Sequence, residues 1–370
     1  MDGKPRVLVG LSGGLDSTVT VRLLQEQGYA PEGITLILQP APERPQAADA
    51  CGYDTGVKAA AAAADLGIPH TLVDARERFT WEVLQACWQV FERGGTPNPC
   101  VFCNARIRFG MMVALARERG IDQIATGHYA RITRDPEGRC HLLRGVDPEK
   151  DQSYFLHGVD PALYPHILFP LGGLTKREVR ARAVAWGLKN AQAPESQDVC
   201  FAGPEGHFAE ELRKRFDGHA TPGIFIDETG KRLGAHTGIH RYTLGQRKGL
   251  GFATGERVKI CRIDPATGTI TVSPRPEAVL SDTAHSDDFH WIRPPSPELP
   301  LLAQVRYRQR AVPATILHSD GPRLTVGFAD PVVSVTPGQS LVLYSGEEVI
   351  GGGTLAPMTN DAAAEPPNDQ

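Results

Sequence analysis

The stretch RVLVGLSGGLDS, residues 6–17, joins a short apolar run to a loop rich in glycine and serine. The apolar part predicts a buried strand, and Thr18–Gln27 beyond the loop predicts a helix. Between a strand and a helix, backbone N–H groups and the positive end of the helix dipole converge on an anion. Adjacent glycines let the backbone approach phosphate oxygens closely. Ser12 and Ser17 add hydroxyl donors, and Asp16 could hold Mg²⁺, so the stretch predicts a phosphate-binding loop.

This loop is neither of two common phosphate-binding patterns. No Gly-Lys-Ser/Thr follows at the Walker spacing, and the dinucleotide pattern G-x-G-x-x-G is absent from the loop. The loop therefore belongs to a different class of nucleotide site.

Short apolar runs and helical segments alternate beyond the loop, up to about residue 200. The expected strands are Ile34–Leu38, Pro69–Val73 and Ile121–Thr126, and the expected helices are Lys58–Leu66 and Arg106–Arg119. This alternation is typical of a doubly wound α/β fold with a parallel sheet. Leu36 ends the second strand, where such folds commonly meet an adenine ring. Gly127 follows the fourth strand, where a nucleotide backbone could pass.

The pattern changes after Gly203. Glu205–Phe216 predicts one more helix, and turn signals at roughly 8–12-residue spacing then separate short strands. The expected strands are Gly223–Asp227, Val258–Asp264, Thr269–Pro274, Gln304–Arg308, Ala314–Leu317, Arg323–Phe328 and Ser340–Tyr344. These patterns predict an α/β domain at 1–204, a small central α+β domain at 205–275, a C-terminal β-barrel or sandwich at 276–357 and a disordered tail at 358–370.

Composition narrows the class of protein. The chain has 370 residues, of which 41% are hydrophobic and 22% charged, which excludes a mostly disordered chain. Its net charge of −4 argues against a protein coated in basic charge but leaves room for a local basic face. Seven cysteines are too few for a secreted disulfide scaffold. No run approaches the ~20 apolar residues of a membrane span. We therefore expect a cytoplasmic, reduced protein with no membrane partner.

The segment GGTPNPCVFCN, residues 94–104, carries two cysteines in a proline-stiffened loop. We expect a helix to begin near Asn104, which would place Cys103 at its N-terminus. The helix dipole and the nearby Arg106 and Arg108 would favour the thiolate, which is the nucleophilic form.

A third cysteine, Cys200, lies in the polar segment ESQDVCF, residues 195–201. Three interpretations of Cys100, Cys103 and Cys200 stay open. They can be unrelated, because C-x-x-C occurs by chance. Cys103 and Cys200 can perform redox or sulfur-carrying chemistry. Three thiolates can also bind a metal: they are one short of a closed zinc site, but suffice for a [4Fe–4S] cluster with one open iron.

SGGLDS resembles the pyrophosphate loop of the ATP-pyrophosphatase superfamily, whose members adenylate a carbonyl oxygen and release pyrophosphate. Across residues 6 to about 353, further motifs resemble the bacterial tRNA-specific 2-thiouridylase family. These motifs are GGTPNPCVFCN (94–104), ATGHYAR (125–131), KDQSYF (150–155), SQDVCF (196–201), TLGQRKGLG (243–251) and VRYRQ (305–309). The resemblance implies an adenine nucleotide α-hydrolase-like fold for the first domain.

The resemblance also implies a reaction. ATP adenylates the C2 oxygen of the wobble uridine of tRNA, pyrophosphate leaves, and a sulfur nucleophile displaces AMP to give 2-thiouridine. By family position, Cys103 matches the nucleophile and Cys200 the cysteine that carries the persulfide, and the two can form a disulfide after turnover. The implied cofactors are ATP and Mg²⁺. The implied partners are the tRNA anticodon arm and a persulfide-donating carrier or cysteine desulfurase.

Family positions assign the binding residues as well. The ATP contacts are Gly10, Leu11, Ser12, Gly13, Gly14, Leu15, Asp16, Ser17, Leu36 and Gly127. The tRNA contacts are Asn98, Pro99, Cys100, His128, Lys150, Asp151, Gln152, Arg306, Tyr307 and Gln339. The first three of these match the segment that meets the target base, which must be flipped out of the stacked anticodon loop. Lys150 and Arg306 suit phosphate, and Tyr307 can stack on a base.

One residue departs from the family pattern. Many members carry Asp where this chain has Cys100. The additional thiol strengthens the alternative in which Cys100, Cys103 and Cys200 hold a [4Fe–4S] cluster whose open iron binds sulfide. We prefer the persulfide mechanism because it uses only features shared with the Asp-bearing members.

Basic residues concentrate in the second half of the chain. The segment from Lys231 to Arg262 contains eight basic residues and one acidic residue, Glu256. Arg306, Arg308 and Arg310 alternate with other residues and would share one face of a strand. We therefore expect a basic face that binds RNA in a salt-sensitive way.

Two other functions remain possible from these residues. An ATP-pyrophosphatase that uses a nitrogen nucleophile would not need Cys103 or Cys200. A non-catalytic RNA-binding or sulfur-carrying protein would release no pyrophosphate from ATP in the presence of tRNA.

Overall fold

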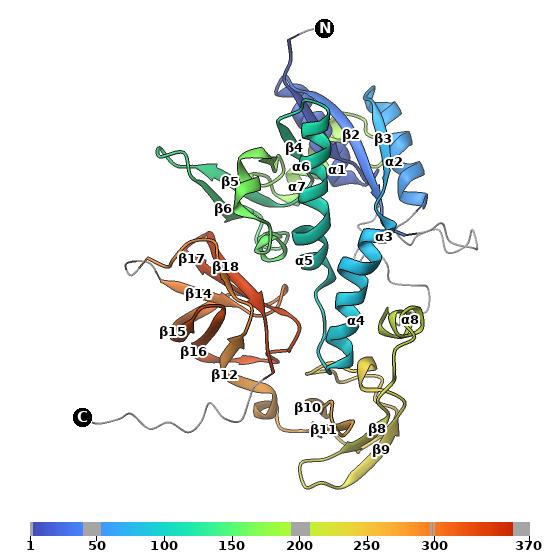
Figure 1. The fold of residues 1–370 in the computed structure, drawn as a ribbon, viewed down its shortest axis with the longest axis vertical. Coiled ribbons are helices and arrows are strands. Elements are labelled where there is room, and N and C mark those ends of the chain that lie inside the picture. Colours follow the sequence, from blue (N-terminus) through green and yellow to red (C-terminus); the bar gives the residue numbers. More distant parts are fainter. Residues whose placement is uncertain (1–2, 40–52, 194–207, 297, 299, 358–370) are drawn as a thin grey trace.

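The computed structural model describes residues 3–39, 53–193, 208–296, 298 and 300–357. Its N-terminal part is built on a five-stranded parallel sheet with the strand order β3-β2-β1-β4-β7 (Figure 1). The strands are β1 (Arg6–Gly10), β2 (Ala30–Ile37), β3 (His70–Asp74), β4 (Gln123–Ala125) and β7 (Ile167–Leu168). This sheet confirms the predicted parallel α/β fold.

Helices cover both faces of this sheet. They include α1 (Leu15–Glu26), α2 (Tyr53–Leu66), α6 (Phe109–Glu118) and α7 (Lys176–Ala185). Because side chains alternate along a strand, Val7 and Val9 of β1 pack against α1 and α2, while Leu8 joins the cluster that contains α6. Helix α7 packs onto α1 through Val179 and Ala183.

A helical arm runs from the sheet toward the other domains (Figure 1). It consists of α3 (Arg76–Phe79), the π-helical turn η2 (Thr80–Leu84), α4 (Gln85–Glu92), α5 (Pro99–Cys103) and the π-helical turn η3 (Asn104–Arg108), followed by α6. The helical segment Pro99–Glu118 is 20 residues long with a hydropathy of 1.2, enough by length and composition to cross a membrane. Half of it is buried inside the protein, and it packs as a core helix, with Phe109 and Met112 in the main hydrophobic cluster.

The central part combines α8 (Phe208–Arg215) with a four-stranded sheet of order β10-β11-β8-β9. Its strands are β8 (Gly223–Ile226), β9 (Arg232–His236), β10 (Lys259–Asp264) and β11 (Thr269–Ser273), and a short turn η6 (Ile239–Arg241) follows β9. Phe225, Ile260 and Ile270 form its core. Helix α8 packs against α4, which connects this part to the helical arm.

The C-terminal part forms a large antiparallel sheet, which we call the barrel. Its strands are β12 (Leu280–Ser286), β13 (His290–Trp291), β14 (Leu301–Gln304), β15 (Val312–Asp320), β16 (Arg323–Val333), β17 (Ser340–Ser345) and β18 (Glu348–Thr354), preceded by η7 (Pro276–Val279). The hairpin β5 (Ala130–Arg134) and β6 (Cys140–Arg144), which comes from the N-terminal half, joins this sheet beside β18. The predicted tail at 358–370 lies outside the described residues.

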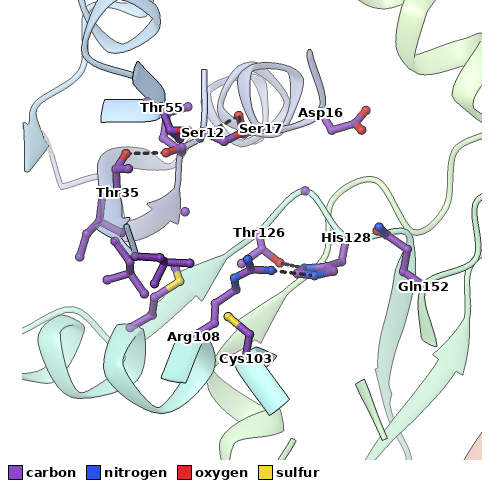
Figure 2. Close-up of a pocket in the computed structure, with 17 residues that line it drawn as sticks. Ser12, Asp16, Ser17, Thr35, Thr55, Cys103, Arg108, Thr126, His128 and Gln152 are labelled. Carbon is purple, nitrogen blue, oxygen red and sulfur yellow. Dashed lines mark hydrogen bonds between the residues drawn. The ribbon is translucent and has the colours of Figure 1, made fainter. Parts of the chain in front are cut away.

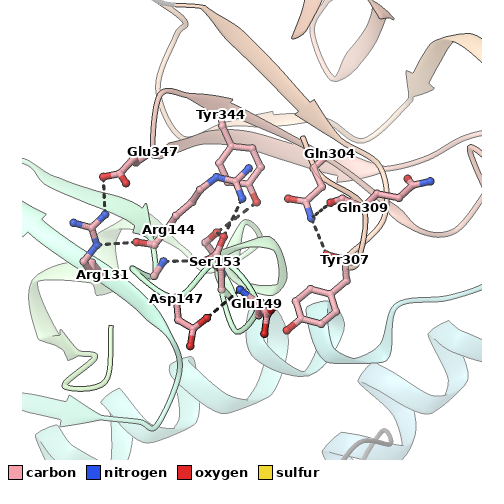
Figure 3. A network of polar contacts seen from close by, with 12 residues as sticks. Arg131, Arg144, Asp147, Glu149, Ser153, Gln304, Tyr307, Gln309, Tyr344 and Glu347 are labelled. Atoms are coloured by element: carbon pink, nitrogen blue, oxygen red, sulfur yellow. Dashed lines mark hydrogen bonds and ion pairs between the residues drawn. The ribbon is translucent and has the colours of Figure 1, made fainter. Parts of the chain in front are cut away.

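The N-terminal and C-terminal parts share one hydrophobic core. Val342, Tyr344 and Val349 of the barrel belong to the same cluster as Leu8 of β1 and residues of α6. Two short 3₁₀ turns, η4 (Ser153–Leu156) and η5 (Pro161–His166), lie at this junction. A polar network surrounds it, in which the Arg144 guanidinium carbon lies 3.6 Å from the centre of the Tyr344 ring (Figure 3). The barrel therefore docks on the α/β sheet through a buried contact.

Candidate nucleotide and sulfur-transfer site

A cavity of about 260 Å³ opens at the carboxyl ends of β1, β2 and β4 (Figure 2). It is lined by Gly10, Leu11, Ser12, Asp16, Ser17, Ile34, Thr35, Leu36, Leu38, Thr55, Cys103, Arg108, Met112, Thr126, Gly127, His128 and Gln152. This edge of an open α/β sheet is where ligands bind. The cavity thus brings Cys103 together with most of the residues that were predicted to bind ATP, although Gly13, Gly14 and Leu15 do not line it.

The serines of the glycine loop hold one another. The Ser17 hydroxyl donates to the carbonyl oxygen of Gly14 at 3.0 Å and accepts from the backbone N–H of Ser12 at 3.2 Å. The two serine hydroxyls are also 3.2 Å apart. These bonds fix the turn at the start of α1, where the helix dipole favours an anion.

Two glycines permit close backbone contacts here. Gly13 has a φ of +75°, and a Cβ added there would lie 2.5 Å from the carbonyl carbon of Lys58. Its carbonyl oxygen accepts from the Asn190 side-chain amide at 3.0 Å. A Cβ added to Gly127 would lie 3.1 Å from the carbonyl carbon of Asp16. The missing side chain of Gly13 therefore lets the loop approach α2, and that of Gly127 lets the turn after β4 approach the start of α1.

Asp16 already has partners within the chain. Its carboxylate accepts from both the Tyr129 hydroxyl at 2.9 Å and the Lys176 ammonium, whose Nζ lies 2.7 and 2.8 Å from the two oxygens. Lys176 and Asp16 are 160 residues apart in the sequence. Sequence patterns did not identify Lys176, because no local motif predicts a contact between residues 160 positions apart.

Cys103 is buried, with 6% of its surface exposed, and its side chain lies beside Arg108 (Figure 2). The expected helix start near Asn104 is wrong: the helix begins at Pro99, with proline at its first position, so Cys103 lies one turn inside. Directly after Cys103 the helix widens into the π-helical turn η3, a local irregularity that is frequent at functional sites.

The two arginines of this turn have different neighbours. Arg108 lines the cavity, and its guanidinium donates to the Asn104 side-chain oxygen at 3.1 Å. Arg106 instead lies over the Phe102 ring at 4.7 Å and donates to the carbonyl oxygen of Glu82. Only Arg108, of these two, shares the cavity with Cys103.

The protonation of His128 follows from its neighbours. Burial, together with the Arg108 guanidinium, lowers the pKa of His128 to about 3, so the ring is neutral at physiological pH. An arginine can only donate, and its Nη1 lies 3.3 Å from Nε2 of the ring, so Nε2 is the acceptor. The proton therefore sits on Nδ1 and is donated to the Thr126 hydroxyl at 2.7 Å. In this structure the predicted tRNA contact His128 orients Arg108.

The segment before α5 is held by two other domains. The backbone N–H of Thr96 donates to the Pro337 carbonyl at 2.8 Å, and the Thr96 hydroxyl lies 2.9 Å from that of Thr243. The Gln339 side-chain amide donates to the carbonyls of Thr96 and Pro97 at 2.9 and 3.1 Å. Gln339, predicted as a tRNA contact, thus fixes the loop that leads to the predicted base contacts Asn98, Pro99 and Cys100.

Asp151 and Gln152 also bond within the chain. The buried Asp151 carboxylate accepts from the side chains of Arg144 and Ser153 and from the backbone of Gly145 and Ser153. Gln152 lines the cavity, and its side-chain oxygen accepts from the Tyr129 backbone at 3.0 Å. Lys150 is partly exposed on the same segment.

The predicted strand at 304–308 is wrong, because β14 ends at Gln304 and a turn follows. The Gln304 side-chain amide donates to the carbonyls of Arg306, Tyr307 and Gln309 (Figure 3). These bonds hold residues 305–309 in a turn around the amide group. Arg306, Arg308 and Arg310 therefore do not share one strand face. The Tyr307 ring packs on Phe155 with 4.3 Å between centroids, which places this turn over the KDQSYF segment.

Cysteines other than Cys103 are less well connected to the cavity. Cys100 is partly exposed one turn before Cys103 and does not line the cavity, and neither forms a disulfide. In the described part of the chain, no group of three His, Cys, Asp or Glu residues could hold a metal ion. Cys200 lies outside the described residues.

Three family models match successive segments of the chain. Family models match as "tRNA methyl transferase HUP domain" over residues 5–204, "tRNA methyl transferase PRC-barrel domain" over 213–274 and "Aminomethyltransferase beta-barrel domain" over 281–355. The tRNA-specific 2-thiouridylase MnmA of Synechococcus sp. (strain JA-3-3Ab) is 44% identical over 358 residues, covering 95% of this chain and 94% of that protein. That of Geobacter metallireducens is 40% identical and covers 96% and 98%.

Solved structures resemble the chain more distantly. A 4-thiouridine synthetase–RNA complex with bound ATP has a TM-score of 0.35 and 16% identity, covering 57% of this chain and 50% of that one. NMN synthetase from Francisella tularensis has a TM-score of 0.33 and 17% identity, covering 59% and 79%.

Proposed function

This chain belongs to the family of tRNA-specific 2-thiouridylases, and from that premise we propose which of its residues act in adenylation and which in sulfur transfer. It is an ATP-dependent tRNA sulfurtransferase, as the motifs predicted. The observation that carries the residue assignment is the shared cavity: Ser12, Asp16 and Ser17 of the glycine loop line one space of about 260 Å³ together with Gly127 and Cys103. A uridine placed there can meet the α-phosphate of ATP and a sulfur nucleophile without leaving the site.

The adenylation step uses the loop end of the cavity. Backbone N–H groups of residues 12–17 bind the phosphates at the start of α1, and Leu36 lies against the adenine. A lone pair of uridine O2 attacks the α-phosphorus, and the bond to the bridging oxygen breaks with its electron pair leaving on pyrophosphate. Asp16 could supply one carboxylate to Mg²⁺, which is commonly bound by one or two carboxylates plus substrate phosphates and would neutralise their charge.

The sulfur step uses the Cys103 end. The terminal sulfur of a Cys200 persulfide attacks C2, and AMP leaves with the electrons of the C2–O bond. The Cys103 thiolate then attacks the Cys200 sulfur, the S–S bond breaks toward the base, and 2-thiouridine leaves as a Cys103–Cys200 disulfide forms. Arg108, held by Asn104 and neutral His128, supplies positive charge beside the Cys103 sulfur.

The iron–sulfur alternative needs three thiolates. Two of the three candidates, Cys100 and Cys103, lie in the described part of the chain, and the third, Cys200, lies outside it. We favour the persulfide route because it uses only features shared with the Asp-bearing members of the family. Iron analysis of anaerobically purified protein decides the matter. The persulfide mechanism also predicts that Cys100→Asp keeps its activity, since that side chain does not line the cavity.

The central test compares two buried cysteines. Full-length protein is incubated with ATP, Mg²⁺, a tRNA transcript with uridine at the wobble position and a persulfide-generating cysteine desulfurase with its carriers. Cys103→Ser should bind ATP and release pyrophosphate but form no 2-thiouridine by mass spectrometry. Cys87→Ser, at a buried cysteine outside the cavity, should retain both activities. Normal thiolation by Cys103→Ser would overturn the assignment of Cys103 as the nucleophile. Measuring tRNA thiolation in a cytoplasmic fraction of the cell would check the predicted cytoplasmic location.

A further inference from the structure

Helix α8 follows Cys200 in the sequence and packs beside the other cysteine of the proposed sulfur step. It begins at Phe208, eight residues after Cys200. Leu212, which is 3% exposed, belongs to the same buried apolar cluster as Cys103 and Phe91. The Phe208 ring packs against that of Phe91 in α4, with 5.9 Å between centroids. The place where α8 packs therefore limits how far from Cys103 the chain at Cys200 can lie.

One carboxylate fixes the polar side of α8. Oε1 of Glu210 accepts from Nη2 of Arg213, on the same helix, at 2.8 Å. Its other oxygen lies 3.0 Å from Nε2 of His240 in η6 and 3.7 Å from Nε of Arg241. The hydrogen bonds from Arg213 and His240 lower the pKa of Glu210 to about 2, against the effect of burial. Since an ionised carboxylate can only accept, His240 donates from Nε2, and Glu210 ties α8 to the central part.

His240 is the buried partner in this contact. Its side chain is 2% exposed, and its ring meets that of Trp88 edge-on with 5.7 Å between centroids. Trp88 belongs to α4, and a Cβ added to Gly218, just after α8, would collide with the same indole. The bond between Glu210 and His240 therefore lies where α8, η6 and α4 meet, and removing the carboxylate would leave a buried donor unpaired.

The sulfur step requires two sulfur atoms from distant parts of the chain to meet. The rate at which two tethered groups meet depends on their effective concentration, which is set by where the tethers are held. Before Cys200, the Asn190 side-chain amide holds the chain at the nucleotide end, where it donates to Gly13 at 3.0 Å and to Thr18 at 2.9 Å. After Cys200, α8 holds the chain at the cluster that contains Cys103.

We propose that Glu210 and His240 are positioning residues for sulfur transfer: their contact holds α8 on α4 and so raises the effective concentration of the Cys200 sulfur at Cys103. The proposal rests on the proposed function for the roles of the two cysteines. Neither Glu210 nor His240 lines the nucleotide cavity. Loss of their contact should therefore slow the sulfur step and leave adenylation unchanged.

The test measures how fast Cys103 and Cys200 form a disulfide in full-length protein without tRNA or ATP. Diamide, an azo compound, is the oxidant: it takes up two electrons and two protons, and becomes a hydrazine, as the two thiols join. Mass spectrometry of non-reduced peptides quantifies the bond. Glu210→Ala should form it roughly tenfold more slowly, about the effect of one lost hydrogen bond to a charged group. Glu210→Gln keeps an acceptor for His240 and should recover part of the rate.

The matched control is Glu32→Ala. Glu32 is 19% exposed, as Glu210 is, and pairs with Arg6 at 2.7 Å far along the chain from α8. This variant should form the disulfide at the wild-type rate. Equal rates for wild type and Glu210→Ala would overturn the proposal and leave the proposed function intact. If wild-type protein forms no bond between Cys103 and Cys200, the roles proposed for these cysteines fail, and the positioning role fails with them.

A second measurement separates positioning from a general loss of structure. With tRNA, ATP, Mg²⁺ and a persulfide source, Glu210→Ala should release pyrophosphate at the wild-type rate but form 2-thiouridine roughly tenfold more slowly. Equal losses in both steps would show that Glu210 only supports the fold, and would overturn the proposal.

Discussion

The two ends of the site are built in different ways. At the nucleotide end, one continuous stretch supplies the strand, the loop and the helix, and residues 12–17 bond to one another. At the outer end, the segment 94–98 is held by Thr243 of the central part and by Pro337 and Gln339 of the barrel. Local sequence thus determines the conformation of the proposed phosphate loop, whereas the conformation of the proposed base-binding segment depends on how three parts of the chain dock.

The largest expected effect is at the nucleotide end. Gly13→Ala places a methyl group against the Lys58 backbone and forces alanine to a φ of +75°. A left-handed conformation alone costs roughly 1–2 kcal/mol for alanine, and the loop must also move. We expect ATP affinity to fall roughly 100-fold, which corresponds to about 2.7 kcal/mol, as measured by calorimetry.

A second glycine provides the matched control. Gly28 has a φ of +88°, but a Cβ there meets nothing within 4 Å. Gly28→Ala should lower the melting temperature without changing ATP affinity. If Gly13→Ala binds ATP normally, the loop is not the phosphate site and the contrast between the two ends is lost.

An intermediate effect is expected at the buried junction of the barrel. His157 is 4% exposed, stacks on His290 and has no hydrogen-bond partner for either ring nitrogen in the described part of the chain. Burial lowers the pKa of His157 to about 3 from an unfolded value of 6.5. As the pH falls from 6.5 toward 3, the unfolded chain binds a proton that the native state excludes. Stability conferred by the neutral ring is therefore lost across that window.

The variant His157→Phe removes this titration. It should flatten the pH dependence of the unfolding free energy below pH 6.5 by up to about 1.4 kcal/mol per pH unit. His128 contributes a loss of the same sign at the nucleotide end, so part of the slope should remain. Urea unfolding at several pH values measures the slope, and an unchanged slope would show that His157 is accessible to protons.

The nucleotide end was predictable because its signals are local. An apolar run, two glycines and a helical segment lie next to each other, and all three were found from residues 6–27. The helix start at Pro99 was missed although its signal was present, because proline at the first helical position was taken as part of a stiff loop.

The remaining errors concern contacts that no local pattern encodes. Lys176 meets Asp16 across 160 residues, and β6 joins the barrel by pairing Leu143 with Glu348. The alternation of arginines with other residues around Arg306 predicts a strand. Instead, the Gln304 side-chain amide donates to three backbone carbonyls, and the chain forms a turn. In each case tertiary packing, absent from the sequence pattern, decides the outcome.

The smallest expected effect concerns the outer end, where two roles of Gln339 can be separated. Its amide donates to the carbonyls of Thr96 and Pro97, and family position also assigns it to tRNA. Gln339→Ala removes two hydrogen bonds of about 0.5–1.5 kcal/mol each. We expect the KM for tRNA to rise roughly tenfold, with ATP affinity unchanged.

Hydrogen exchange without tRNA separates these roles. If Gln339 positions the segment, backbone exchange at residues 94–98 should increase in Gln339→Ala, because the segment loses its support from the barrel. Gln25→Ala, which removes a comparable amide-to-carbonyl bond with Leu66 at 3.1 Å, should change neither exchange at 94–98 nor the KM for tRNA. A raised KM with unchanged exchange would mean that Gln339 acts on tRNA directly, and that the outer end is held without it.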